Sequence, residues 1–235
     1  MSGSAKPRRG RDNHLTSLLL VLPLLLFYEV GVLFADVMNG ADFITGALLR
    51  YVGLKGFLGV QAGILLLAVG LALYLRRTQK LEMRRFIPVL LESGVYALTM
   101  GTLILFVMTD LLGMDPRLAA GGPALGIFDK LVLSVGAGVW EELVFRLVIL
   151  GGLHWLGVRA LKLRGWVSLV LALAISSLLF SIAHHIGPLG EPFRLGVFTY
   201  RVMAGLFFGA LFQFRGLPIA VWTHALYDIY VMLLQ

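Results

Sequence analysis

Cysteine is absent from the 235-residue sequence, which excludes disulfide bonds, thiolate metal ligands and a cysteine nucleophile. Charge is scarce as well: charged residues make up 14% of the chain, whereas soluble domains carry about 25%. Hydrophobic residues account for 59%, compared with roughly 45–50% in soluble proteins. This composition excludes an ordinary soluble domain and indicates a single polytopic membrane domain.

Long apolar runs occur repeatedly along the chain. A helix needs about 20 residues to cross a hydrocarbon core of about 30 Å, and each run approaches that length. We expect membrane spans at residues 15–35, 57–75, 87–109, 127–150, 166–183, 195–214 and 217–234. An interfacial helix is expected at residues 40–56. The predicted fold is all-α, a polytopic membrane helix bundle of about seven transmembrane helices, with eight as the alternative.

Lysine and arginine are concentrated in alternate connecting segments. If the N-terminus is cytoplasmic, the cytoplasmic segments hold 13 of the 20 basic residues. The positive-inside rule therefore predicts a cytoplasmic N-terminus and, with an odd number of spans, a C-terminus outside. This distribution also explains the net charge of +7, so a nucleic-acid partner is not needed. We expect an integral protein of a prokaryotic cell membrane.

Three charges stand together inside the fourth span, in the octapeptide VWEELVFR at residues 139–146. An ionisable residue within a membrane is costly unless it is paired or faces a water-filled cavity. Glu142 and Arg146 are four residues apart, so a purely structural ion pair on one helix face is one interpretation. Glu141 points about 100° away from Glu142 and therefore needs a partner or a proton of its own.

Two later spans add histidines and a carboxylate at helical spacing. The fifth span ends in LLFSIAHHIG, where Phe180 and His184 share a helix face. The seventh contains VWTHALYDIY, where His224 and Asp228 share a face. A lone histidine in a membrane span is commonly a hydrogen-bonded structural residue. The combination instead favours a site that activates water, with imidazoles as metal ligands or acids, Asp228 orienting His224, and Glu141 as the base.

In their order along the chain, these motifs resemble the signature of the CPBP family, the CAAX-processing and bacteriocin-processing intramembrane proteases, also called ABI proteins. The motifs are Glu141-Glu142-x-x-x-Arg146, Phe180-x-x-x-His184 and His224-x-x-x-Asp228. The resemblance covers residues 125–235 and implies an all-helical protease core whose spans enclose a polar cavity. By this division, residues 1–13 form a cytoplasmic basic tail and residues 14–124 form the N-terminal transmembrane helices.

The resemblance also implies a catalytic role for each motif. Glu141 would activate the attacking water, and Glu142 and Arg146 would complete that motif. Arg146 would either fix its helix or hold a substrate carbonyl or carboxylate. His184 and His224 match the histidines of the second and third motifs. Asp228 stands where the family has asparagine or aspartate, a position that could help to form an oxyanion site.

Metal and substrate contacts complete the expected site. A Zn²⁺ cofactor is a hypothesis, with Glu142, His184 and His224 as its ligands, and no other cofactor is expected. Phe180 and Arg201 are expected to contact the substrate, as is the Arg146 of the first motif. The alternative for Arg201 is that it snorkels to the membrane surface.

The predicted function is that of an intramembrane endopeptidase that cleaves a membrane-associated protein or peptide with glutamate-activated water. Its expected partners are that substrate and the lipid bilayer. A catalytically silent scaffold or immunity factor of the same fold is one alternative, and a proton-coupled transporter is another.

The predicted depths of two site residues in the membrane conflict. When each is counted from the ends of its span, Glu141 lies near mid-membrane and His184 at the outer end.

Overall fold

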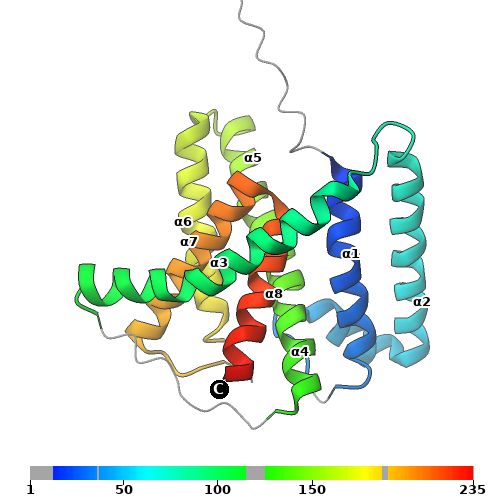
Figure 1. Cartoon of the computed structure of the whole chain (residues 1–235), viewed down its shortest axis with the longest axis horizontal. Coiled ribbons are helices and arrows are strands. Elements are labelled where there is room, and N and C mark those ends of the chain that lie inside the picture. Colours follow the sequence, from blue (N-terminus) through cyan, green and yellow to red (C-terminus); the bar gives the residue numbers. More distant parts are fainter. Residues whose placement is uncertain (1–12, 36, 115–124, 187–189, 235) are drawn as a thin grey trace, which may run out of the picture.

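Helices make up all the regular structure in the described residues, which are 13–35, 37–114, 125–186 and 190–234 of a computed structural model (Figure 1). They are α1 (His14–Gly31), α2 (Phe43–Leu75), η1 (Met83–Arg85), α3 (Phe86–Phe106), η2 (Val107–Leu111), α4 (Ile127–Gly136), η3 (Ala137–Leu150), α5 (Gly151–Arg159), α6 (Gly165–Ala183), α7 (Leu195–Arg215) and α8 (Leu217–Leu234). The predicted all-α membrane bundle is confirmed. The predicted basic tail falls outside the described residues except for Asn13.

Six helical stretches in the described ranges are long and apolar enough to cross a membrane. They are His14–Gly31, Leu49–Leu75, Met83–Leu111, Gly165–Ala183, Leu195–Arg215 and Leu217–Leu234. The remaining predicted span, 127–150, is also helical, but it carries Glu141, Glu142 and Arg146. Its predicted end is wrong, because the helix continues without a break through α5 to Arg159. The first span is shorter than predicted, since α1 ends at Gly31.

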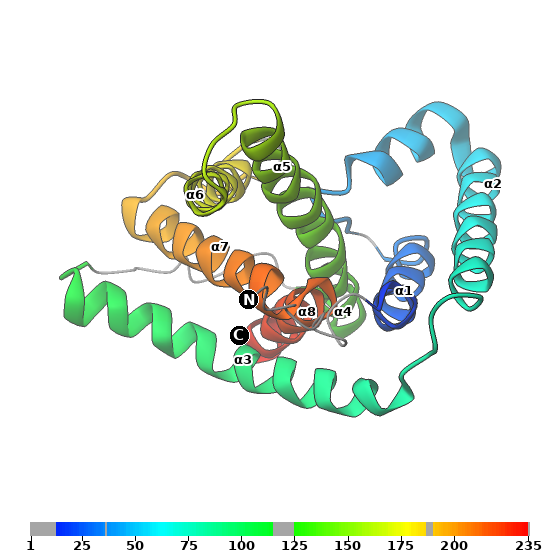
Figure 2. The ribbon, with the colours of Figure 1, turned by 90° about the horizontal axis from the view of Figure 1, so that it is seen from above.

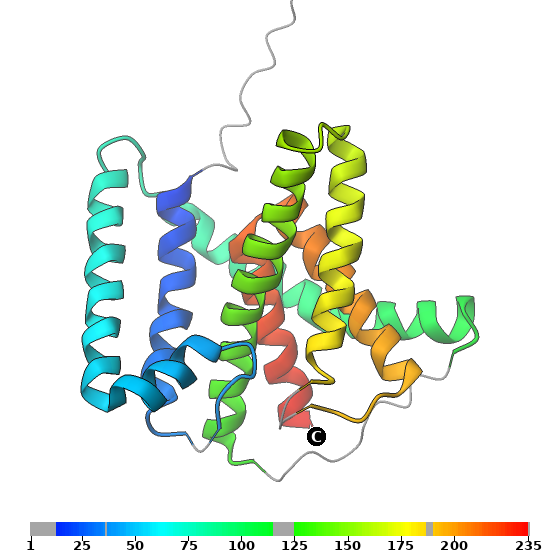
Figure 3. The same ribbon diagram turned by 180° about the vertical axis from the view of Figure 1, so that it is seen from behind.

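A sharp bend divides α2 into two arms. Gly53 at the bend has φ 65° and ψ −178°, a conformation that residues with a Cβ rarely adopt. The short arm, which begins at Phe43, runs sideways from the end of the long arm (Figure 3). The helix predicted at 40–56 therefore exists as this short arm, and it turns at Gly53 into the second span.

The centre of the bundle is α8, with α1, α3, α4 and α7 around it (Figure 2). α8 comes close to η3 at Gly138. A Cβ added there would lie 2.7 Å from the backbone nitrogen of Ala225 and 2.8 Å from the backbone oxygen of Val221. Small residues allow membrane helices to approach in this way. The glycine thus lets α8 bring its polar residues, among them His224, against η3.

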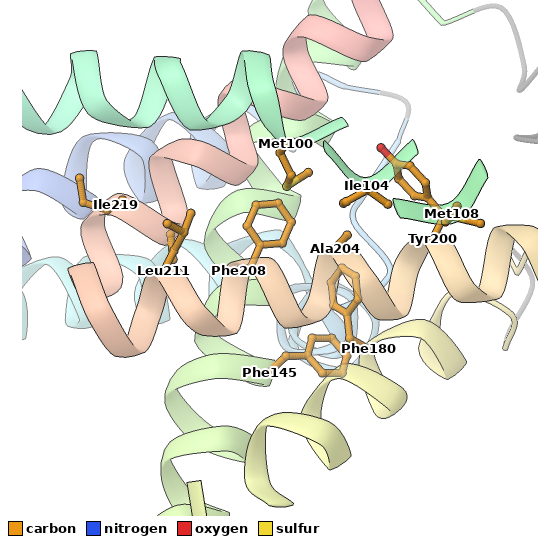
Figure 4. Packing of buried hydrophobic residues seen from close by; sticks show 11 residues of the cluster. Met100, Ile104, Met108, Phe145, Phe180, Tyr200, Ala204, Phe208, Leu211 and Ile219 are labelled. Atoms are coloured by element: carbon orange, nitrogen blue, oxygen red, sulfur yellow. The ribbon is translucent and has the colours of Figure 1, made fainter. Parts of the chain in front are cut away.

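α7 separates α3 from the pair formed by η3 and α6. Figure 4 shows Met100 and Ile104 of α3 with Met108 of η2 on one side of α7, and Phe145 of η3 with Phe180 of α6 on the other. The close contact of α7 with α6 depends on Gly205, where an added Cβ would lie 2.9 Å from the Cα of Ser177. Apolar packing on both sides therefore fixes α7 beside the polar residues of η3.

The hairpin formed by α5 and α6 resolves the conflict of depths between Glu141 and His184. Glu141 precedes Arg159 by nearly the same number of residues as His184 follows Gly165, so both lie roughly 27 Å from the turn. Counting from the span ends placed His184 at the outer end of its span, away from the level of Glu141, because the preceding helix was assumed to end at Leu150. Its extension through α5 shifts α6 along the bundle, and the two residues come to the same level.

The most basic connecting segments lie at one end of the bundle, where α1 begins (Figure 1). That end holds the connection from α2 to α3, with Arg76, Arg77, Lys80, Arg84 and Arg85, and the turn from α5 to α6, with Lys162 and Arg164. This clustering is what the positive-inside rule requires of a cytoplasmic face. The assignment of that end to the cytoplasm stays a prediction.

Candidate active site

Glu141 lies where η3, α6 and α8 meet, and it is 6% exposed. Its Oε2 atom is 3.6 Å from Nε2 of His184 and 3.8 Å from Nε2 of His224. Among the described residues, Oε2 accepts no hydrogen bond. One carboxylate oxygen therefore faces two imidazole nitrogens, and both lie beyond direct hydrogen-bond distance.

Glu142 points in another direction and is fully buried. Its Oε1 atom accepts a hydrogen bond of 2.7 Å from Nδ1 of His224 and lies 3.1 Å from Nη1 of Arg146. The ion pair predicted from the four-residue spacing is therefore present. Glu142 makes the short contact with the ring of His224, and Asp228 Oδ2 lies 3.6 Å from Nε2, so the orienting role predicted for Asp228 stays a prediction.

The segment η3 carries these glutamates in a π-helical conformation, which the sequence did not indicate. In this wider helix an N–H bonds to the C=O five residues earlier, as the N–H of Gly151 does to Arg146. Short π-helical turns are frequent at functional sites. Here the conformation persists from Ala137 to Leu150 and includes every residue of the first motif.

Arg146 is 1% exposed, and its guanidinium lies between two aromatic rings. Its Cζ atom is 4.3 Å from the ring centroid of Phe180 and 5.3 Å from that of Phe208. A cation this close to ring faces is attracted by their electron density. Nη2 also donates to the carbonyl of Gly205 over 3.5 Å. These contacts tie η3 to α6 and α7, which favours a helix-fixing role over substrate contact.

The two histidines are held at the nitrogens that face away from Glu141. Nδ1 of His184 is 2.8 Å from the carbonyl oxygen of Phe180, which can only accept, so Nδ1 carries the proton. The same reasoning places a proton on Nδ1 of His224, which contacts Glu142. Phe208 stacks on His224 with 4.2 Å between ring centroids. Both rings thus present Nε2 to the space beside Glu141.

The remaining predicted contacts lie at the edge of this cluster. Phe180 is 3% exposed and packs edge-on against Phe145 and His184, so it forms part of the wall of the site. Arg201 is less buried and donates to Glu191 over 2.5 Å. The sequence had not singled out Glu191 as a partner of Arg201.

Asn39 is a contact that sequence reasoning missed altogether. It lies between α1 and α2, outside the three motifs, and its Nδ2 donates to Oε1 of Glu141 over 3.0 Å. No periodicity or spacing could have found it, because its connection is irregular and 102 residues separate it from Glu141.

The predicted zinc ligands do not fit a metal site as they stand. Within the described ranges, no three His, Asp or Glu side chains are grouped so that they could hold a metal ion. Glu142 faces Nδ1 of His224 and the guanidinium of Arg146, whereas His184 faces Glu141. The side chains of the three ligands proposed for Zn²⁺ therefore do not converge on one point.

Comparison with known proteins matches the segment that contains all three motifs. Residues 123–230 match the family described as Rce1-like, type II CAAX prenyl endopeptidase. The chain matches no curated protein and no solved structure. The resemblance drawn from the three motifs is confirmed by this match. The segment from residue 123 to residue 230 thus matches the CPBP/CAAX protease family.

Proposed function

We propose that the protein is an intramembrane endopeptidase that hydrolyses a peptide bond of a membrane-associated substrate with a water molecule activated by Glu141. The observation that carries this proposal is the placement of Glu141 Oε2 within 4 Å of Nε2 of both His184 and His224. This arrangement lies within the segment that matches a family of CAAX-type proteases.

Activation of water needs an acceptor for each of its protons. A water beside Glu141 can donate one hydrogen to Oε2 and the other to the unprotonated Nε2 of His184, which orients its oxygen toward the substrate carbonyl. Glu141 takes the first proton as the oxygen attacks the carbonyl carbon. The C–N bond then breaks, and Glu141 returns that proton to the departing amine nitrogen, which restores the carboxylate.

The negative charge that develops on the carbonyl oxygen needs a donor. Three carboxylates lie near the ring nitrogens of His224: Glu142 at Nδ1, and Asp228 and Glu141 at Nε2. They favour an imidazolium, which would donate Nδ1–H to Glu142 and Nε2–H to the oxyanion. In this role for His224, Asp228 balances the charge of the ring and need not donate to the oxyanion itself.

The substrate class is narrowed by the family and by the location of the site. The family match favours a prenylated C-terminal tail. The other candidate substrates are a bacteriocin leader, a C-terminal membrane anchor and a regulatory peptide. Each of them could reach a site that lies among membrane helices.

The test compares wild-type protein with Glu141→Gln. The purified proteins are incubated with a farnesylated CAAX peptide, and membrane fractions of cells that express each are compared by proteomics. We expect the wild type to cut the peptide, or to yield a shortened membrane protein, and Glu141→Gln to do neither while remaining folded. Equal cleavage by both proteins would refute the mechanism, and no cleavage by the wild type in either assay would refute the function.

A further inference from the structure

A hydrogen bond from the N-terminal half of the chain reaches the carboxylate of Glu141. Nδ2 of Asn39 donates to Oε1, and Asn39 is 8% exposed. Hydrogen bonds to an ionised acceptor are roughly twice as strong as neutral ones, and burial strengthens them further. The terminal torsion of a glutamate is broad, so its carboxylate turns easily unless it is held. With Oε1 held, Oε2 stays directed at the two histidines.

Asn39 is itself fixed in the orientation that this bond requires. Its Oδ1 accepts from the backbone N–H of Ala41 over 2.8 Å, so the amide NH₂ group is the part left to face Glu141. Its backbone N–H donates to the hydroxyl of Tyr28 over 3.3 Å. The ring of Tyr28 lies so close to Gly136 that an added Cβ would be 2.3 Å from it. The loop is therefore anchored to α4.

Polar contacts also join the first two helices to η3 next to the site. Glu29 of α1 accepts from Nε1 of Trp140 over 3.2 Å and from Nε2 of Gln61 over 2.5 Å. Trp140 directly precedes Glu141. Around these contacts, buried apolar residues of α1 and its C-cap, α2, α4, η3 and α8 form one cluster, which includes Tyr28, Val32, Phe57, Val132, Val135, Val139 and Val221. The position of Asn39 is thus set by the docking of α1 and α2.

From these contacts we propose that Asn39 is a positioning residue that holds Glu141 in its reactive orientation. The N-terminal half of the chain, which lies outside the family match, would then complete the active site. This role rests on the proposed function, in which Glu141 is the base that activates water.

Two substitutions separate the bond to Glu141 from the turn that Asn39 forms. Asn39→Asp keeps an oxygen for the N–H of Ala41 but replaces the donor to Glu141 with a second acceptor. Asn39→Ser also keeps an acceptor for the turn, with a side chain too short to reach Glu141. For a positioning role we expect kcat to fall by roughly 10–100-fold in both variants, since small misplacements of a catalytic group have effects of this size. KM should change by less than about threefold, because uniform substrate binding is not affected.

Gln61→Glu is the matched control, because it makes the same amide-to-carboxylate change against the buried Glu29. It should lower the melting temperature, and kcat per folded protein should fall by less than in either Asn39 variant, because Asn39 and its bond to Glu141 remain. All rates are measured on the probe that wild type cuts and Glu141→Gln does not, and are normalised to folded protein by size-exclusion chromatography. If Asn39→Asp does not fold, Asn39→Ser decides the outcome.

The outcomes distinguish this proposal from the proposed function. Wild-type kcat in both Asn39 variants, beside an inactive Glu141→Gln, would overturn the positioning role and leave the protease intact. A rise in KM with unchanged kcat would overturn it as well, because Asn39 would then act in substrate binding. Full activity of Glu141→Gln would instead overturn the proposed function, and with it the role of Asn39.

Discussion

His224 of α8 donates from Nδ1 to Oε1 of Glu142 in η3 over 2.7 Å, which joins the first and third motifs directly. The bond explains why two adjacent glutamates stand in one membrane helix. Glu142 contacts His224 of the third motif and Arg146 of its own motif. Glu141 instead directs one carboxylate oxygen at His184 and His224. The two carboxylates therefore have different surroundings and, in the proposed mechanism, different roles: Glu142 fixes side chains, and Glu141 activates water.

Substitution of His224 by asparagine should distinguish the role of Nδ1 from that of Nε2. The asparagine amide can donate to Glu142 from near the position of Nδ1, but it has no group at the position of Nε2. We expect cleavage to fall by at least about 100-fold, the effect of losing one oxyanion donor. The melting temperature in detergent should stay near that of wild type.

His224→Leu is the companion variant, because it loses both nitrogens and leaves Glu142 without this donor. It should melt at a lower temperature than His224→Asn. Retained activity in His224→Asn would mean that Nε2 takes no part in the reaction.

A glycine contact offers a test of the packing that brings α8 to η3. In Gly138→Ala the new methyl group would meet backbone atoms of Val221 and Ala225, which cannot turn aside. Overpacking of this kind costs about 1–3 kcal/mol, and it would also push His224 away from Glu142. We expect lower detergent stability and lower activity together. Gly152→Ala, where an added Cβ meets nothing within 4 Å, is the control and should match wild type in both measurements.

The sequence predicted the spans and the co-facial pairs because both follow from local regularities. Apolar runs of membrane length mark helices, and a spacing of four residues places two side chains on one face, as the contact of Glu142 with Arg146 confirms. These rules do not depend on which helices are neighbours. They are sufficient to predict most of the membrane spans and the residues of the three motifs.

What could not be predicted depends on contacts between distant segments. The bond from Asn39 to Glu141 requires the docking of α1 and α2, which leaves no periodic trace in a short irregular connection. The π-helical conformation of η3 and its unbroken continuation to Arg159 were missed because an apolar run gives neither the hydrogen-bond pattern nor the end of a helix. The level of His184 was misjudged for the same reason.

The orientation of the chain can be tested with topology reporters. A reporter inserted at Thr78, in the basic connection from α2 to α3, should be cytoplasmic, and one fused after residue 235 should be outside. This expectation follows from the clustering of basic segments at the end where α1 begins. Both reporters on the same side of the membrane would show that an even number of spans lies between Thr78 and the C-terminus, where five are predicted.

Substitutions of the buried pair Glu142 and Arg146 distinguish effects on stability from effects on catalysis within the first motif. Neither side chain reaches solvent, so removal of one partner leaves a buried charge, at a cost of roughly 3–5 kcal/mol. Glu142→Ala and Arg146→Ala should therefore lower the melting temperature as well as activity. Glu141→Gln should lower activity while it melts like wild type, because Glu141 has no such ion pair with a lysine or arginine among the described residues.

The double substitution Glu142→Gln with Arg146→Gln decides whether lost charge balance is the cause. It leaves no lone charge from the pair, and the new amide at position 142 can still accept from Nδ1 of His224. We expect it to recover more folded protein than either single alanine variant, as measured by detergent melting beside the cleavage assay. Its activity should stay low, because Arg146 no longer ties η3 to the rings of Phe180 and Phe208. If Glu141→Gln melts lowest and the pair variants melt like wild type, the roles assigned to the two glutamates are reversed.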